Sequence, residues 1–176
     1  MIESTTIDGL LLVTPKSVTD DRGTVRELFR HSAFAEAGLP TRWNQLNLTW
    51  TRQGAIRGLH GEAASKLIGL AGGTAYGVYL DARPGSPTRG AVATVELSVG
   101  RQVFVPAGVC NGFQATSPEG CEYLYCFDTE WTPGMPGVAV TPLDPALGIS
   151  WPIPVDPDNR ALLSAKDAAA PTFAEL

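Results

Sequence analysis

The chain has two histidines, His31 and His60, and these are its only imidazole groups. Transition-metal sites usually combine two or three histidines with a carboxylate. His31 leads into a segment that is expected to be helical and stands far from His60 in the sequence, so the two match such a site poorly. We therefore expect no metal, and any chemistry has to run on side-chain acids and bases.

His60 closes the segment Ala55–His60 and is the first candidate for such chemistry. An imidazole has a suitable ordinary pKa for a general base near neutral pH. Arg57 and Lys66 supply nearby positive charge that could hold an anion or a developing oxyanion. A lone histidine is more often structural, and surface cations are common, so both interpretations stay open on this pattern alone.

The elements that must position these side chains are mostly short strands bounded by Gly, Pro, Asp or Ser. Ser32–Ala37 is expected to be a short helix, with Ser32 as a candidate N-cap and Gly38 at its end. From Pro142 onward the chain is rich in Pro and Asp and is expected to wrap the domain as loops and turns. So many short strands predict a sandwich or a barrel. The expected strands are Leu10–Thr14, Trp43–Thr51, Ala55–Leu59, Lys66–Leu70, Thr74–Asp81, Ala91–Leu97, Gln102–Val105, Gly112–Ala115 and Glu122–Thr129.

Two of these strands carry rows of side chains that bear on function. Gln45, Asn47 and Thr49 share one face of their strand. Such a polar face is usually solvated, but in a small ligand-binding barrel it can line the cavity instead. A second row consists of aromatic rings on one face of the strand 122–129: Tyr123, Tyr125 and Phe127. Taken alone, an aromatic row indicates core packing more often than a site.

Length and charge limit the class of protein. At 176 residues and 18.6 kDa the chain is expected to form one domain over residues 1–176. Its net charge of −5 and the lack of a basic run argue against a nucleic-acid partner, although a few arginines could still hold a phosphate. The N-terminal part has only four consecutive apolar residues, Leu10–Val13, so we expect no signal peptide and no membrane span.

Three cysteines, Cys110, Cys121 and Cys126, show no CxxC spacing. If Cys121 and Cys126 share a strand, their odd separation puts them on opposite faces, where they cannot pair locally. We therefore expect reduced thiols in a cytoplasmic protein.

Ordered blocks along nearly the whole chain point to a family. The blocks are Asp20-Asp21-Arg22-Gly23, Gln45-Leu46-Asn47, Arg57-Gly58-Leu59-His60, Lys66-Leu67, Asp81 to Thr88, Val105 to Gly108, Gly112-Phe113, Tyr123-Leu124-Tyr125, Ile149 to Pro152 and Leu163 to Asp167. In this order and at this spacing the sequence resembles the dTDP-4-dehydrorhamnose 3,5-epimerase family. The resemblance implies an all-β, cupin-type jelly-roll barrel with one or a few short helices, and a homodimer that exchanges N-terminal strands.

The resemblance also implies a reaction on a dTDP-linked 4-keto-6-deoxyhexose. The C4 ketone acidifies the hydrogens on C3 and C5, because the carbanion left behind delocalises as an enolate. Such an enzyme needs a base, a proton donor on the opposite face and a positive group at the enolate oxygen, but no metal and no redox cofactor.

Catalytic roles carry over to matching positions. His60 corresponds to the family's base, and Asp167 to the carboxylate that orients it and favours its protonated form. Tyr125 corresponds to the tyrosine that returns the proton from the opposite face. Lys66, with help from Asn47, would polarise the ketone and hold the enolate oxygen.

The resemblance assigns further residues to substrate binding. Arg57 and Gln45 would lie toward the diphosphate, and Arg22 would reach the nucleotide across a dimer interface. Glu27, in the same N-terminal region, matches the family pattern and is expected to contact the substrate. Asp81 lies on a strand that would run into the cavity and is expected in the neighbourhood of the histidine.

Several positions depart from the family pattern. Asn111 replaces a histidine and keeps only hydrogen bonding, because an amide cannot relay a proton at neutral pH. Val25 stands where an aromatic ring often stacks on thymine, Trp131 replaces a tyrosine, and the loop Gly61–Ser65 is shorter than usual. The proton-transfer set stays intact, so we expect a specialised relative from deoxysugar or natural-product biosynthesis that inverts C3, C5 or both.

Two other hypotheses remain open at this stage. The scaffold could be a non-catalytic barrel that binds a small molecule. Alternatively, the pocket could be recruited to another ketone whose enolisation the same base drives, because the expected thymine contacts are weakened at Val25. Retention of His60, Lys66, Tyr125 and Asp167 together favours the epimerase.

Overall fold

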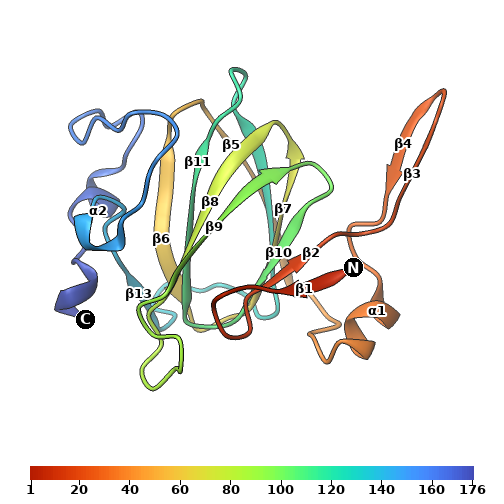
Figure 1. Cartoon of the computed structure of the whole chain (residues 1–176), viewed down its shortest axis with the longest axis horizontal. Helices are drawn as coiled ribbons and strands as arrows, with labels where there is room; N and C mark the ends of the chain where they lie inside the picture. The colour runs from red at the N-terminus through yellow and green to blue at the C-terminus, as the bar shows by residue number, and fades with distance from the viewer.

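The computed structural model describes residues 1–176 and consists mainly of two antiparallel β-sheets that face each other (Figure 1). The six-stranded sheet has the order β1 (Ile2–Ser4), β2 (Leu11–Val13), β10 (Gln102–Val105), β7 (Lys66–Gly72), β12 (Cys121–Phe127) and β5 (Gln45–Thr51). The five-stranded sheet has the order β13 (Gly137–Ala139), β6 (Ile56–Glu62), β11 (Val109–Ala115), β8 (Thr74–Asp81) and β9 (Val92–Ser98). This arrangement confirms the expected all-β jelly roll.

Helical structure is confined to short pieces at the two ends of the chain. They are α1 (His31–Glu36), the 3-10 turn η1 (Pro145–Leu147), α2 (Ala165–Ala168) and the 3-10 turn η2 (Phe173–Glu175). The expected N-cap at Ser32 is wrong, because α1 already begins at His31 and its N-cap position, Arg30, makes no side-chain cap bond. No helix has the length and apolar character that crossing a membrane requires.

The main core lies between the two sheets, where alternate side chains of facing strands meet. Ile68 of the six-stranded sheet and Tyr79 of the five-stranded sheet are both fully buried. The rings of Phe113 and Tyr123 stack across the sheets, with centroids 3.8 Å apart and an interplanar angle of 6°. These contacts close one part of the barrel and leave the part beside β5, β6 and β12 to form a cavity.

The C-terminal segment wraps the outer side of the five-stranded sheet, as expected from its composition (Figure 1). Trp151 and Phe173 pack on a buried cluster that includes Leu59 and Leu80. The backbone N–H of Ile56 donates to the carbonyl of Leu162 at 2.7 Å. This segment therefore brings α2 alongside β6.

Three elements were not among the expected strands: β1, β13 and the hairpin formed by β3 (Ser17–Asp20) and β4 (Gly23–Arg26). The hairpin pairs only with itself and projects away from the barrel (Figure 1). Three expected strands are also longer than predicted, and β7 is one of them, since it continues to Gly72. β6 continues through His60 to Glu62, and β11 starts at Val109, so that His60 and Asn111 face each other in the register of the same ladder.

Candidate active site

A cavity of about 870 Å³ opens between β5, β6 and β12. A second pocket of about 340 Å³ adjoins it and contains buried Lys66 and Asp167. The two pockets share Thr49, His60, Glu62, Tyr125, Phe127 and Lys166. Together they form one continuous site whose walls come from both sheets and from α2.

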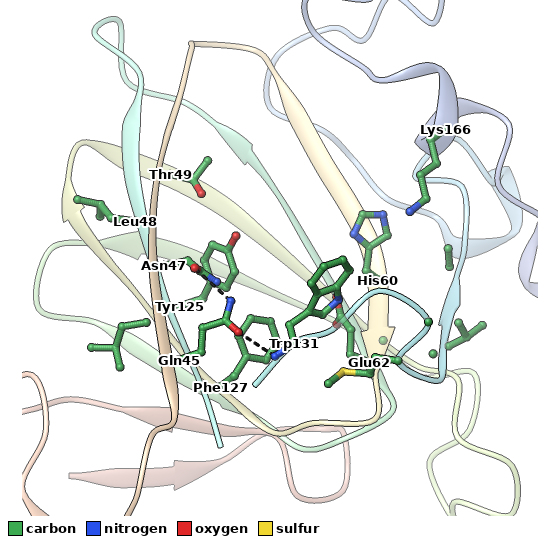
Figure 2. Close-up of a pocket in the computed structure, with 17 residues that line it drawn as sticks. Gln45, Asn47, Leu48, Thr49, His60, Glu62, Tyr125, Phe127, Trp131 and Lys166 are labelled. Carbon is green, nitrogen blue, oxygen red and sulfur yellow. Dashed lines mark hydrogen bonds between the residues drawn. The ribbon is translucent and has the colours of Figure 1, made fainter. Parts of the chain in front are cut away.

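The polar row of β5 lines this cavity (Figure 2). Gln45, Asn47 and Thr49 are half-buried, whereas the alternate residues Leu46 and Leu48 are exposed to 62% and 57%. The cavity-lining interpretation of this row is therefore the right one, and the solvated one is wrong.

His60 forms a close pair with Asp167 of α2. Its Nε2 atom lies 2.7 Å from Oδ1 of Asp167, whose side chain is 8% exposed. Ser164 caps α2 by accepting the backbone N–H of Asp167 at 3.0 Å, which fixes the carboxylate at the first turn. Burial would raise the pKa of Asp167, but hydrogen bonds from His60 and Ser164 outweigh it and lower that pKa. An ionised Asp167 can only accept, so His60 donates from Nε2, and in the neutral imidazole Nδ1 is then the nitrogen with a free lone pair.

Tyr125 lies on the other wall of the cavity (Figure 2). It belongs to β12 of the six-stranded sheet, whereas His60 belongs to β6 of the five-stranded sheet. Its ring packs edge-on against Phe127, with centroids 5.5 Å apart, and beside Tyr123 at 6.0 Å. The aromatic row thus has two roles: Tyr123 packs in the core and borders only the smaller pocket, while Tyr125 and Phe127 line both pockets.

Lys66 of β7 is 4% exposed at the inner end of the site. Its Nζ atom donates to the side chains of Glu62 and Asn111 and, at 3.4 Å, to the backbone carbonyl of His60. Burial lowers the pKa of Lys66, and the Glu62 carboxylate opposes this change. The amino group of Lys66 thus lies beside the backbone of His60, within the smaller pocket.

The remaining expected residues that reach the cavity are Gln45, Asn47 and Trp131 in the larger pocket and Arg57 in the smaller one. Gln45 donates from Nε2 to Oδ1 of Asn47 at 3.3 Å and accepts the backbone N–H of Trp131 at 2.8 Å (Figure 2). The Trp131 side chain is 47% exposed beside the cavity. Arg57 lines the smaller pocket, and its Nε atom donates to Thr51 at 3.0 Å. The contact with Trp131 ties β5 to the loop after β12, and the contact of Arg57 ties β6 to the end of β5.

The structure does not bring Asp81 to this site, so that expectation is wrong. Its carboxylate is fully buried and accepts hydrogen bonds from Arg83, Ser86 and Thr88. Burial would raise the pKa of Asp81, but these hydrogen bonds outweigh it and hold that pKa well below its usual range. The side chain therefore organises the turn between β8 and β9.

Arg22 and Glu27 also lie outside the cavity of their own chain. Arg22 stands at the turn of the projecting hairpin, where it pairs with Asp20 at 2.7 Å and its side chain is 90% exposed. Glu27 pairs with Arg30 beyond the hairpin. Within one chain, neither residue can contact a molecule bound between the sheets.

Two charged residues of the cavity were not among the predicted site residues, Glu62 and Lys166. Glu62 follows His60 by two residues, and strand alternation would have placed both on one face if the strand had been extended past His60. Lys166 directly precedes Asp167. No group of three or more His, Cys, Asp or Glu side chains is arranged to hold a metal ion.

Comparison with known proteins identifies a family that matches almost the whole chain. The model of a family described as dTDP-4-dehydrorhamnose 3,5-epimerase matches residues 4–175. A dTDP-4-dehydrorhamnose 3,5-epimerase of Pseudomonas aeruginosa is 37% identical over 175 residues, which cover 96% of this chain and 93% of the relative.

Two solved structures share the fold throughout. NovW of Streptomyces spheroides, a 4-keto-6-deoxy sugar epimerase from the novobiocin gene cluster, superposes with a TM-score of 0.91 at 31% identity, covering 99% of this chain and 88% of its own. ChmJ of Streptomyces bikiniensis, a 3′-monoepimerase in complex with dTDP-quinovose, superposes with a TM-score of 0.88 at 31% identity, covering 98% and 87%.

Proposed function

The chain belongs to the dTDP-4-dehydrorhamnose 3,5-epimerase family, and from this premise we propose that it acts as a single domain, residues 1–176, on a dTDP-linked 4-keto-6-deoxyhexose. The reaction inverts C3, C5 or both, in deoxysugar or natural-product biosynthesis. NovW and ChmJ, which are similar over the whole chain, act on sugars of this kind or bind a dTDP-sugar.

The observation that carries this proposal is the placement of a paired base and a phenol on opposite walls of one cavity. The base is His60, held by Asp167 at 2.7 Å, and the phenol is Tyr125. A flat enolate held between them can lose a proton to one side and gain a proton from the other. Inversion requires this two-sided geometry, and a binding barrel without catalysis has no need of it.

In the proposed mechanism, Nδ1 of His60 takes the proton from the carbon next to the ketone. The electrons of the broken C–H bond form the enolate, whose oxygen is stabilised by Lys66 with help from Asn47. The hydroxyl of Tyr125 then gives its proton to the opposite face of the same carbon, and the tyrosinate and the imidazolium exchange protons with water. Asp167 stabilises the imidazolium that forms in the first step.

Substrate binding is proposed to involve the polar outer part of the cavity. Gln45 and Arg57 lie toward the diphosphate, and Lys166 adds a cation that lines both pockets. Asn111 and Trp131 shape the sugar site at positions where the family carries other side chains. These two residues are the first candidates for setting which carbon is inverted.

A homodimer is part of the proposal, because Arg22 and Glu27 can reach a cavity only in another chain. Two exposed apolar surfaces support it. The hairpin exposes Val18 to 59% and Val25 to 76%, and the outer face of β5 exposes Leu46, Leu48 and Trp50 to 62%, 57% and 57%. Covering such surfaces is favourable, since apolar area leaves water.

We also propose a cytoplasmic location. Cys110, Cys121 and Cys126 are all buried and unpaired, as is usual for proteins of a reducing compartment.

Proton exchange with solvent tests the function directly. Incubation with dTDP-4-keto-6-deoxyglucose in deuterated water is expected to place deuterium at C3, C5 or both, as read by proton NMR. His60→Ala is expected to abolish exchange, and His31→Ala, which removes the exposed second histidine on α1, is the matched control and retains it. Absence of deuterium at both carbons with the wild-type protein contradicts the proposal.

A further inference from the structure

Glu62 is an acidic side chain in the cavity that none of the proposed proton-transfer steps uses. It follows His60 by two residues on β6, so strand alternation turns both side chains into the same space. Its carboxylate accepts a hydrogen bond from Nζ of Lys66, and the two side chains are 20% and 4% exposed. A carboxylate therefore touches the very ammonium group that is proposed to hold the enolate oxygen.

Among the hydrogen-bond partners of Lys66, Glu62 differs from the others in its charge. An ammonium group has three N–H donors. The acceptors around Nζ are the Glu62 carboxylate, the side-chain carbonyl of Asn111 and the backbone carbonyl of His60. Only Glu62 among them carries a negative charge, and no other acidic side chain forms a salt bridge with Lys66.

The charges around Lys66 give this contact a chemical consequence. Burial lowers the pKa of Lys66, because the ammonium group loses its hydration, and the nearby Glu62 carboxylate raises it. Burial also raises the pKa of Cys110 to about 12 and that of Tyr123 well above its usual value, so both stay neutral, while Asp167 is paired with His60. The titratable and charged groups that share the pocket of Lys66, or lie beside it, belong to the neighbouring strands and α2: Arg57, His60, Glu62, Cys110, Tyr123, Tyr125, Lys166 and Asp167.

We propose that Glu62 is a positioning residue, which holds the Nζ atom of Lys66 at the cavity wall and keeps the lysine cationic despite its burial. A neutral lysine could still donate a hydrogen bond, but it could not balance the negative charge that develops on the enolate oxygen. The effect of Glu62 on catalysis rests on the proposed function, whereas its effect on Lys66 does not.

The titration of Lys66 can be measured without any substrate. The chain has three lysines, Lys16, Lys66 and Lys166, so labelling lysine Cε with carbon-13 gives three NMR signals that Lys16→Arg and Lys166→Arg assign. In Glu62→Gln the amide can still accept the hydrogen bond, and we expect the Lys66 signal to titrate at a lower pH than in the wild-type protein. Glu96→Gln, on the exposed side of β9, is the matched control and leaves it unchanged.

Two outcomes of the titration decide whether the charge of Glu62 keeps Lys66 protonated. Glu62→Asp keeps the charge and is expected to titrate nearer to the wild-type protein than Glu62→Gln does. A Lys66 signal that titrates at the same pH in the wild-type protein and in Glu62→Gln overturns the proposal, whatever the activity of either.

The dependence of catalysis on pH separates a charge effect from a general loss of structure. For Glu62→Gln we expect kcat/KM to fall about tenfold more at pH 9 than at pH 7, because more of the lysine is then neutral in the variant. An equal fall at both pH values overturns the proposal. If the wild-type protein exchanges no sugar proton, the proposed function fails, and the lysine titration still decides the role of Glu62.

Discussion

Nε2 of His60 donates to Oδ1 of Asp167 at 2.7 Å, which leaves Nδ1 as the ring nitrogen that can take a proton. The donor must be the histidine, because hydrogen bonds keep the pKa of Asp167 lowered and its carboxylate ionised. One contact therefore sets both the orientation of the ring and the identity of the basic atom.

Replacing Asp167 by Asn tests this relationship. The amide can donate to the ring and favour the wrong tautomer, and it cannot stabilise the imidazolium. We expect kcat to fall by about 10²-fold or more, by analogy with other carboxylate–histidine pairs. Steady-state kinetics measures the loss, circular dichroism checks the fold, and Asp158→Asn, at a 96% exposed side chain, serves as the control. Retention of full kcat would show that the pair is only structural.

Tyr125→Phe should separate proton removal from inversion. The change keeps the ring that packs against Phe127 but removes the hydroxyl that is proposed to donate the proton. We expect inversion to slow by about 10²-fold or more, while His60 still exchanges the substrate proton with deuterated water on its own face. Proton NMR follows both processes in one sample. Tyr76→Phe, in the outer cluster near Trp151, is the control, and equal slowing of exchange and inversion would contradict the assignment.

Leu48→Asp tests the proposed dimer. The side chain is 57% exposed on the outer face of β5, so a charge there costs little in an isolated chain but opposes burial in an interface. We expect a monomer by light scattering, and a smaller thermal stabilisation by dTDP, because Arg22 of another chain no longer reaches the cavity. Thr94→Asp, on the exposed side of β9, is the matched control. A dimer that survives Leu48→Asp would place the interface elsewhere.

Asp81→Asn tests the structural role found for this residue. The carboxylate is buried and accepts from Arg83, Ser86 and Thr88, so we expect a loss of about 2–4 kcal/mol in the free energy of unfolding at pH 7. Activity per folded molecule should be unchanged, since the side chain lies outside the cavity.

The lowered pKa of Asp81 also predicts how the stability difference between wild type and Asp81→Asn changes with pH. The pKa of Asp81 is lower in the folded protein than the ordinary value of 3.8, so its contribution to stability is present above that value and is lost as the pH falls toward the folded pKa. The difference between wild type and Asp81→Asn in denaturant unfolding should therefore shrink as the pH drops below about 4. A difference that stays constant down to pH 3 would contradict this explanation.

Much of the fold could be predicted from local pattern. The bounds of β8 and β10 were predicted to the residue, and seven further strands were located, because turn residues separate short apolar runs along the chain. β1, β13 and the hairpin were missed, since they are short, and the hairpin is almost wholly exposed and shows little apolar alternation.

The sequence by itself determined the all-β class and the family, and it named the residues that are proposed to carry the proton chemistry. Only the tertiary structure decided which face of β5 lines the cavity, because alternation defines two faces and does not say which one is inside. It also decided that Asp81 stabilises the turn between β8 and β9, and that Glu62 forms a salt bridge with Lys66. His60 and Asp167 are 107 residues apart, and their contact depends on how the C-terminal segment packs along β6, which no local pattern encodes.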